Sequence, residues 1–217
     1  LEAGSEEQKQ AHLPGIAEGR VRATLAFSGE RGTNDPEAVT ATVRHEGDAL
    51  VLDGTHAFVL DGHTADLLVV AARQPGTAGA DGLCLVAVPG DAAGLSRTRR
   101  PTVDRTRRLA RIELCGVRVP ADAMLGEAGT AAPALARTLQ LAAIALAAEQ
   151  VGGAQRCLDM SVAHALERVQ FGRPIGSFQA IKHKCADMMI AIESARSAAY
   201  YAACVAAERS EELAVCA

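Results

Sequence analysis

The amino-acid sequence predicts an α+β fold, with a β-rich first part and a helical second part. Up to about Gly129, runs of Leu and β-branched residues alternate with Gly-Asp and Pro-Gly turns, as in closely spaced strands. After Gly129, alanine dominates and apolar residues recur at spacings of three and four, as in long helices. Short turns between strands favour an antiparallel barrel or sandwich over βαβ units.

A short helix opens the chain and strands follow it. Residues 5–13 are predicted to form an amphipathic helix that ends at Pro14-Gly15, because proline and glycine both interrupt helices. A loop rich in Gly, Asn and Asp is expected over residues 29–36. Strands are predicted over residues 20–28, 39–45, 50–52, 57–60, 67–72, 83–88 and 112–119.

Two long helices are predicted in the second part. The first covers residues 131–167, and the glycine- and proline-containing segment 168–176 should end it. Ser177 then suits the N-cap of a second helix that runs from Phe178 to the end of the chain. A hairpin of two Ala-rich helices needs further helices to bury both apolar faces. Either the rest of a longer chain or another subunit would supply them.

The composition argues against several classes of function. The 22 basic and 26 acidic residues give a net charge of −4 and aromatic residues are only 3%, so nucleic acid is not an expected partner. No apolar stretch is long and uncharged enough to span a bilayer, and the polar opening residues do not resemble a signal peptide. The six cysteines form no C-x-x-C pair and the six histidines show no metal-ligand spacing. We therefore expect free thiols, no metal site and a cytoplasmic location.

Two clusters could carry binding chemistry. The seven arginines between Arg97 and Arg111 are either a basic patch for a phosphate-bearing ligand or solvated charge at strand edges, and the interleaved Thr, Pro and Asp favour the second. In the helix break, Arg168 and Gln179 would lie on facing sides of one tight loop. A guanidinium, an amide and a helix N-terminus suit an anion. A structural role is equally open, with Arg168 capping a helix and a phenylalanine filling the hairpin core.

Three motifs carry a resemblance to one family. Residues 4–14 read GSEEQKQAHLP, residues 52–62 read LDGTHAFVLDG, and residues 168–183 read RVQFGRPIGSFQAIKH. In this order they resemble the acyl-CoA dehydrogenases over essentially the whole chain, and the last motif is highly specific.

The resemblance implies a three-domain architecture. Residues 1–19 would end an N-terminal helical domain, residues 20–128 would form a middle β-barrel domain, and residues 129–217 would supply the first helices of a C-terminal four-helix bundle. The chain is therefore expected to be a fragment that lacks most of the first domain and the end of the last.

The resemblance also implies an activity, the FAD-dependent α,β-desaturation of an acyl-CoA thioester. Electrons would pass to an acceptor such as an electron-transfer flavoprotein. In the family, FAD takes the β-hydride and a Glu removes the α-proton, and that Glu is expected beyond residue 217. No catalytic residue is therefore assigned in this chain. Many members also carry an Asp and an Arg for acyl or pantetheine contacts where this chain has Gln140 and Ala143.

Cofactor residues follow from the resemblance, with departures on one side. The family's flavin loop, T-E-x-x-x-G-S-D, reads SGERGTND here, so Ser28 keeps the hydroxyl while Gly29, Thr33 and Asn34 replace the Glu, Gly and Ser. The family's aromatic-Ile-Thr/Ser motif is Phe58–Leu60, which lacks the hydroxyl that faces the flavin N5 edge. The residues that match contacts with the FAD of a neighbouring subunit are kept. The expected cofactor-binding residues are Phe27, Ser28, Thr33, Asn34, Phe58, Val59, Leu60, Arg168, Gln170, Phe171, Phe178 and Gln179.

The chain thus departs from the family in its own flavin motifs but keeps the residues that match contacts with a neighbour's FAD. This is the pattern expected of the less catalytic subunit in a mixed complex. Some bacterial members, notably actinobacterial ones that act on bulky steroid-type CoA thioesters, resemble α2β2 assemblies with shared flavins. We therefore expect a subunit of a homo- or heterotetrameric acyl-CoA dehydrogenase of fatty acid or steroid degradation. The alternatives are a self-sufficient homotetramer and a non-catalytic subunit that only completes a neighbour's FAD site. In the mixed enzyme, Leu60 should face apolar neighbours or an empty pocket rather than an isoalloxazine ring.

Overall fold

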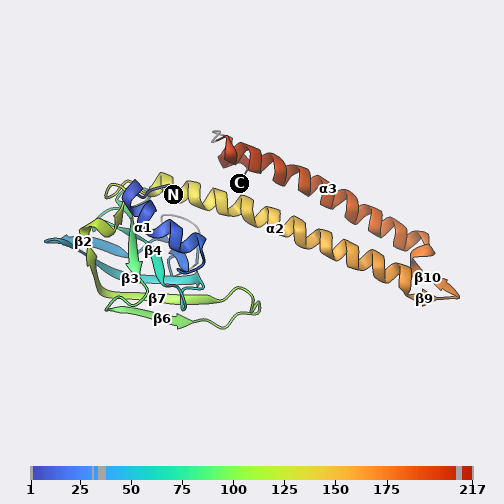
Figure 1. The fold of residues 1–217 in the computed structure, drawn as a ribbon, viewed down its shortest axis with the longest axis horizontal. Coiled ribbons are helices and arrows are strands. Elements are labelled where there is room, and N and C mark those ends of the chain that lie inside the picture. Colours follow the sequence, from blue (N-terminus) through green and yellow to red (C-terminus); the bar gives the residue numbers. More distant parts are fainter. Residues whose placement is uncertain (1, 31, 34–37, 209–211, 217) are drawn as a thin grey trace. The chain divides into compact units, whose positions relative to one another are not determined.

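The computed structural model describes residues 2–30, 32–33, 38–208 and 212–216. The chain divides into two compact units, Leu1–Leu135 and Ala136–Ala217, which Figure 1 colours along the sequence. The boundary falls in the first turn of α2 (Ala132–Glu167), a few residues after the change in composition at Gly129. The three-domain division with limits at residues 19 and 128 stays a prediction.

The first helix, α1 (Glu6–Ala17), is longer than predicted. A capping box starts it: Ser5 Oγ accepts from the Gln8 N–H at 3.2 Å, and Gln8 Oε1 accepts from the Ser5 N–H at 2.9 Å. The predicted stop at Pro14-Gly15 is wrong, because the helix passes through both residues. Pro14 lies in the last turn, so the N–H that proline lacks costs the helix only one hydrogen bond.

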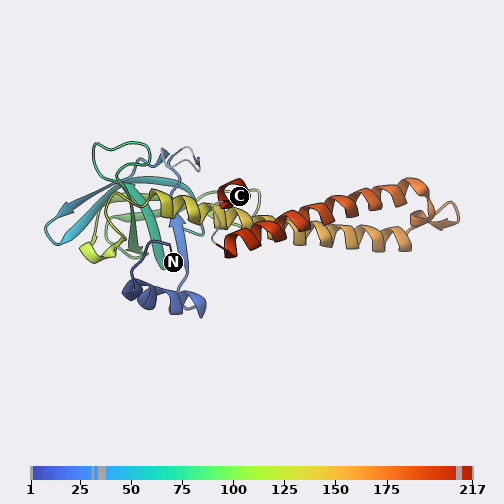
Figure 2. The same cartoon turned by 90° about the horizontal axis from the view of Figure 1, so that it is seen from above.

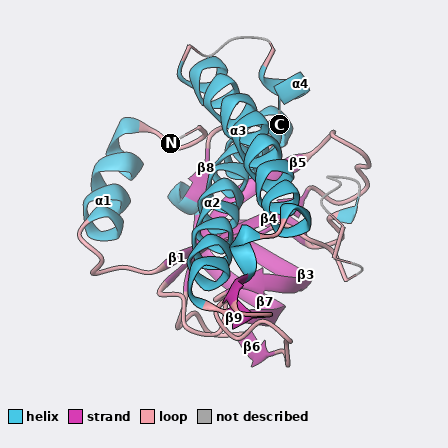
Figure 3. Ribbon diagram, turned by 90° about the vertical axis from the view of Figure 1, so that its right-hand side faces the viewer, coloured by secondary structure: helices cyan, strands magenta, loops and turns pink. Residues whose placement is uncertain are grey.

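The strands of the first unit form one eight-stranded sheet, drawn in magenta in Figure 3. They are β1 (Ala23–Ala26), β2 (Thr42–Glu46), β3 (Ala49–Leu60), β4 (Leu67–Arg73), β5 (Leu83–Pro89), β6 (Leu95–Arg99), β7 (Leu109–Pro120) and β8 (Met124–Leu125). Their order is β6-β7-β3-β2-β4-β5-β8, and β1 pairs with β4. The expected α+β architecture is confirmed, and most pairings are antiparallel. The β1–β4 pair and one bridge between β2 and β4 are parallel, which the pattern of short turns did not predict.

One long strand, β3, forms where two separate strands were predicted. The predicted strands 50–52 and 57–60 are parts of β3, which pairs with β7 along its length. The register between β3 and β7 shifts at Gly54. The φ of Gly54 is 137°, and a Cβ there would lie 2.5 Å from the Cα of Ala41. Only glycine fits this approach. The short polar strand β6 has no counterpart among the predicted strands, because its Arg-rich sequence lacks apolar alternation.

The core of the first unit is aliphatic. Its fully buried side chains include Leu50, Leu52, Leu68, Val70, Val86 and Ile112, which come from β3, β4, β5 and β7. Among the described residues, three polar ones are buried with them, namely Ser28, His56 and Arg73. Buried polar groups require hydrogen-bond partners. The contacts of these three residues are therefore informative about which loops the core holds in place.

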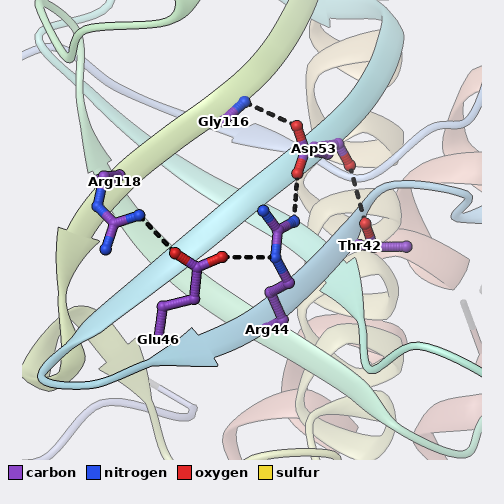
Figure 4. A network of polar contacts seen from close by, with 6 residues as sticks. All are labelled: Thr42, Arg44, Glu46, Asp53, Gly116 and Arg118. Carbon is purple, nitrogen blue, oxygen red and sulfur yellow. Dashed lines mark hydrogen bonds and ion pairs between the residues drawn. The ribbon is translucent and has the colours of Figure 1, made fainter.

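An ion-pair network crosses β2, β3 and β7 (Figure 4). The Arg44 guanidinium contacts Asp53 at 2.5 Å and Glu46 at 2.9 Å, and Arg118 contacts Glu46 at 2.6 Å. Asp53 also accepts from the backbone N–H of Gly116 at 2.7 Å. Hydrogen bonds from Arg44 and then from Gly116 lower the pKa of Asp53, and those from Arg118 and then Arg44 lower the pKa of Glu46.

These lowered pKa values predict an acid-sensitive contribution to stability. A carboxylate whose pKa is lowered by folding stabilises the protein above its unfolded pKa, about 4 for Asp, and this stabilisation is lost as the pH falls through the folded pKa. The wild-type protein should therefore exceed Asp53→Asn in unfolding free energy at neutral pH, and the two should converge as the pH falls through the lowered folded-state pKa of Asp53. Urea unfolding at several pH values measures this difference.

Asp48→Asn is the matched control for that experiment. Asp48 is exposed in the turn between β2 and β3, and no ion pair involves it within the described part of the chain. A gap between wild type and Asp53→Asn that stayed constant down to pH 2 would contradict the role of the Asp53 charge.

The second unit is an antiparallel hairpin of two long helices (Figures 1 and 2). After α2, β9 (Val169–Gln170) pairs with β10 (Arg173–Pro174), a 3₁₀ turn covers Ile175–Ser177, and α3 (Gln179–Ala207) follows. A short helix, α4 (Leu213–Cys216), packs on the pair. The buried residues that join these helices are Ile144, Ala202, Val205 and Leu213. Arg196 of α3 also donates to the Gln155 amide oxygen of α2 at 2.6 Å.

Two predictions for this hairpin are wrong. Ser177 does not cap α3: its hydroxyl donates to the Pro174 carbonyl at 2.7 Å, and Phe178 occupies the N-cap position. The second helix does not run to the end of the chain, because α3 ends at Ala207 and α4 is separate. The helices leave Met160, Leu166, Met189, Ile190, Tyr200 and Tyr201 exposed. The expectation that further helices cover this hairpin stays a prediction.

No helix in the described ranges is both long and apolar enough to cross a membrane.

Candidate functional site

The end of β3 presents two apolar side chains outward. Phe58 lies at a bulge, where the pairing with β7 shifts between His56 and Val59, and its φ is 59°. The Phe58 side chain is 50% exposed and that of Leu60 is 43% exposed, whereas Val59 between them is buried in the core. Of the predicted strand-end residues, Phe58 and Leu60 are therefore the two whose side chains can reach a ligand.

The loop after β1 lies directly against this strand end. Ser28 is buried, and its hydroxyl donates a hydrogen bond to the carbonyl of Ala57. Gly32 approaches the ring of Phe58 so closely that a Cβ would lie 2.5 Å from a ring carbon. The predicted loop and the predicted strand motif thus form one continuous surface.

The other predicted loop residues are less enclosed. Phe27 is half-buried and Thr33 is exposed. Asn34 lies outside the described residues. Gly29 is buried, and a Cβ there would lie 1.9 Å from the backbone carbonyl oxygen of Ala38. A side chain at this position would therefore displace the backbone of the loop.

Two hydroxyls near Leu60 are used within the protein. Thr24 Oγ1 donates to the Leu60 carbonyl at 2.6 Å, and the Ser28 hydroxyl is directed at Ala57. Leu60 itself carries no polar side-chain atom. A polar edge of a ligand at Leu60 would therefore have to be met mainly by backbone amides. An apolar ring surface, by contrast, would find a suitable face on Phe58 and Leu60.

The Arg-rich segment serves the fold at several positions. Arg111 pairs with Glu30 at 2.9 Å and with Glu113 at 3.0 Å, and Arg97 donates to the Ala65 carbonyl at 2.7 Å. These contacts use guanidinium groups to hold loops and strand edges. They favour the interpretation of this segment as strand-edge charge over a phosphate-binding patch.

The second group of predicted residues lies at the tip of the α2–α3 hairpin. Phe171 and Gly172 have φ values of 55° and 76° and form the two-residue turn between β9 and β10. This is the geometry of a type I′ turn, which is strained for an aromatic residue. The Phe171 side chain is 92% exposed, so it does not fill the hairpin core.

The tip carries polar groups beside this ring. Arg168 is exposed, and within the described residues its guanidinium makes no hydrogen bond or ion pair, so it does not cap α2. Only its backbone is tied down, with its carbonyl accepting from the Ile175 N–H at 2.8 Å. Gln170 and Gln179 are also exposed, and the Gln170 amide donates to the Val169 carbonyl at 2.9 Å.

Arg173 joins the tip without having been predicted. Its guanidinium carbon lies 4.2 Å from the centroid of the Phe178 ring, and the rings of Phe171 and Phe178 are 6.2 Å apart in an edge-to-face arrangement. The guanidinium–ring contact holds Phe178 and makes Arg173 a second cation of the tip. Arg173 reaches the tip because it pairs with Gln170 in the β9–β10 hairpin. In the sequence, the one sign of this role was the position of Arg173 inside the helix break.

The two groups have different chemistry. The strand end and its loop offer apolar side chains and backbone, which suit one face or edge of a planar group. The tip offers guanidinium groups, amides and an exposed ring, which suit an anion next to an aromatic group. In the described ranges no group of three or more His, Cys, Asp and Glu side chains could hold a metal ion. Gln140 and Ala143, the departures noted on the first long helix, are half-buried on α2.

Comparison with known proteins gives a consistent result. The model of a family described as "Acyl-CoA dehydrogenase, C-terminal domain" matches residues 132–216. The short-chain specific acyl-CoA dehydrogenase of Homo sapiens mitochondria is 34% identical over 205 residues, which are 94% of this chain and 50% of that protein. The chain thus spans about half the length of the curated relatives it matches.

Solved structures agree over nearly the whole chain. The butyryl-CoA dehydrogenase of Megasphaera elsdenii superposes with a TM-score of 0.92 and 29% identity, over 97% of this chain and 56% of that chain. A structure described as an FAD-dependent dehydrogenase superposes with a TM-score of 0.92 and 32% identity, over 97% of this chain and 57% of that chain.

Proposed function

Because this chain belongs to the acyl-CoA dehydrogenase family, we propose that it is part of an FAD-dependent enzyme that desaturates an acyl-CoA thioester between Cα and Cβ. The contrast between the hairpin tip and the strand end carries the proposal further. The hairpin tip exposes Phe171 and the Arg168 guanidinium, while the Phe58–Leu60 strand end lacks a hydroxyl of its own. Such a chain would complete a neighbour's FAD site better than it builds its own flavin edge.

The residues of the chain fit FAD in two places. At the tip, Arg168 would pair with the pyrophosphate, Gln170 and Gln179 would bond polar edges, and Phe171 and Phe178 would lie against planar parts of the cofactor. The strand end fits less well, because its hydroxyls are used within the protein. A ring at Phe58 and Leu60 would depend on backbone amides near Val59 for its polar edge. The chemistry that FAD supplies when bound is acceptance of the β-hydride.

The proton transfer is assigned elsewhere. Desaturation also removes an α-proton, for which a positioned carboxylate base is commonly worth ~10²–10⁴-fold in rate. We propose that this base lies beyond residue 217 or on a partner subunit. The further partners we propose are an acyl-CoA, an electron acceptor such as an electron-transfer flavoprotein, and a second acyl-CoA dehydrogenase subunit in a cytoplasmic homo- or heterotetramer.

A second function is favoured by the same strand end. With the Ser28 and Thr24 hydroxyls used internally and no hydroxyl on Leu60, the chain could belong to a subunit that completes a neighbour's FAD site without turnover of its own. A tolerant homotetramer is the remaining alternative, since backbone amides can bind without a particular side chain.

Flavin content distinguishes a mixed complex from a self-sufficient homotetramer. The native protein is purified alone and co-expressed with its candidate partner subunit, and bound FAD per subunit and acyl-CoA-dependent reduction of an artificial electron acceptor are measured. Flavin and turnover only in the co-expressed complex support the mixed enzyme. Flavin and turnover in the protein alone indicate a homotetramer. Absence of flavin in both preparations would contradict the proposed function.

A further inference from the structure

His56 is the one buried histidine of the core, and it lies two residues before the bulge at Phe58. Its side chain is 0% exposed on β3, opposite Ile112 of β7. Histidine is costly at such a position, because burial opposes its charged form and both ring nitrogens seek hydrogen-bond partners. The residue carried no function in the sequence motif, where only the three positions after Ala57 were assigned to the cofactor.

One ring nitrogen of His56 has a defined partner. Nδ1 lies 2.9 Å from the Ser28 carbonyl oxygen, and since a carbonyl only accepts, Nδ1 carries the proton. Nε2 is buried and has no hydrogen-bond partner within the described residues. Burial lowers the pKa of His56, while the backbone groups of Ser28 and Ala71 act in the opposite direction. The contact with the Ser28 carbonyl therefore requires a ring tautomer with its proton on Nδ1.

Ser28 returns a second hydrogen bond to the same strand. Its hydroxyl donates to the carbonyl of Ala57, the residue after His56. Two hydrogen bonds in opposite directions thus fasten Ser28 to two consecutive residues of β3. We name this pair of contacts, His56 Nδ1 to Ser28 O and Ser28 Oγ to Ala57 O, the Ser28–His56 clasp.

The clasp lies where the loop and the strand end meet. Directly after Ser28, Gly29 and Gly32 close a tight turn, with the Gly32 N–H donating to the Gly29 carbonyl at 3.0 Å. Gly32 then lies against the ring of Phe58. Releasing Ser28 would therefore free the turn and remove the support behind the Phe58 ring.

We propose that His56 is a positioning residue that, through Ser28, holds Gly29 and Gly32 against the strand end so that Phe58 and Leu60 keep the arrangement needed to receive a planar cofactor. The proposal rests on the proposed FAD function for its consequence, but the clasp itself is a property of the protein without ligand. His56 is 0% exposed, whereas Phe58 and Leu60 face outward, so it is not a catalytic residue.

The test compares two nearly isosteric substitutions, His56→Asn and His56→Leu, in the native protein. Both remove the same ring atoms and leave the same space, but the Asn side-chain amide retains a donor at the position of Nδ1. Loss of the bond in His56→Leu leaves the Ser28 carbonyl unpaired in the core, which corresponds to roughly a ten-fold effect on an equilibrium. Ser28→Ala removes the returning bond from the other side with a minimal change in volume.

Two readouts are measured on each variant. Amide hydrogen exchange over residues 27–30 of the flavin-free protein should become about ten-fold faster in His56→Leu and Ser28→Ala, and change by less than about three-fold in His56→Asn. The dissociation constant for added FAD should follow the same order. Equal behaviour of His56→Asn and His56→Leu in exchange would overturn the proposal and leave His56 as core packing.

The two readouts separate this inference from the proposed function. If no variant and no wild-type preparation binds FAD while exchange follows the expected order, the proposed function fails and the clasp stands. If FAD binds equally well to all variants and exchange is unchanged, the function stands and the clasp is overturned. Should His56→Leu fail to fold, His56→Met, which also lacks a donor and has a volume close to that of histidine, takes its place in the comparison with His56→Asn.

Discussion

Replacing Arg73 by methionine is expected to lower the unfolding free energy by about 2–4 kcal/mol. Arg73 ends β4, is only 8% exposed, and donates to three backbone carbonyls: Val39 at 2.9 Å, Asp81 at 3.0 Å and Gly79 at 2.9 Å. Methionine has a similar volume but no donors, so these carbonyls lose their charged partner. Hydrogen bonds to charged groups contribute about 1.5–3 kcal/mol each, and part of this is offset because a buried guanidinium need no longer be desolvated.

Urea unfolding measures the loss, with amide exchange of β4 and β5 as the local readout. Arg99→Met is the matched control, because Arg99 is exposed on β6 and the same chemical change there should alter stability by less than about 0.5 kcal/mol. Equal effects of the two substitutions would mean that the three carbonyl contacts of Arg73 add nothing to stability.

Replacing Arg168 by alanine is expected to weaken FAD retention in the assembled protein by about 10–100-fold. The guanidinium is exposed at the hairpin tip and has no partner within the described residues, so an incoming phosphate does not have to displace one. The backbone contacts of Arg168 persist in alanine, since its carbonyl accepts from Ile175. The hairpin should therefore remain folded while the cofactor contact is lost.

Flavin absorbance per subunit after gel filtration measures this effect. Arg168→Lys should fall between wild type and Arg168→Ala, because lysine keeps the charge but loses the forked geometry that matches a pyrophosphate. Arg156→Ala removes an exposed arginine of α2, away from the tip, and should retain flavin. Undiminished flavin in Arg168→Ala would remove this residue from the proposed site.

Local patterns in the sequence predicted the element types well and their ends less well. The alanine-rich helices and the break between them follow from spacing and from glycine and proline, and the structure has both helices within a residue or two of the expected start. Pro14 and Ser177 show where local rules failed. A proline in the last turn did not stop α1, and a serine beside a 3₁₀ turn bonded backward to Pro174 instead of forward as a cap.

The two parts of the candidate site differ in how far the sequence could predict them. The tip residues lie within twelve positions of one another, so a tight turn between two helices is enough to gather them. The strand-end site joins Ser28 to residues 28 and 29 positions later, and no local preference predicts that a histidine in the middle of β3 will bond that carbonyl. Arg73 bonds Val39 across 34 positions, and β1 pairs in parallel with β4.

The sequence by itself determined the division into a β-rich and a helical part, the two long helices with the break between them, and the family resemblance, because each depends on residues close together in the chain. Only the tertiary structure decided the continuous β3 across Gly54, the inward direction of the Ser28 hydroxyl and the burial of His56 and Arg73. The physical reason is that a buried polar group must find its partner wherever the packed backbone leaves a free carbonyl or N–H, and that place depends on the pairing of distant strands.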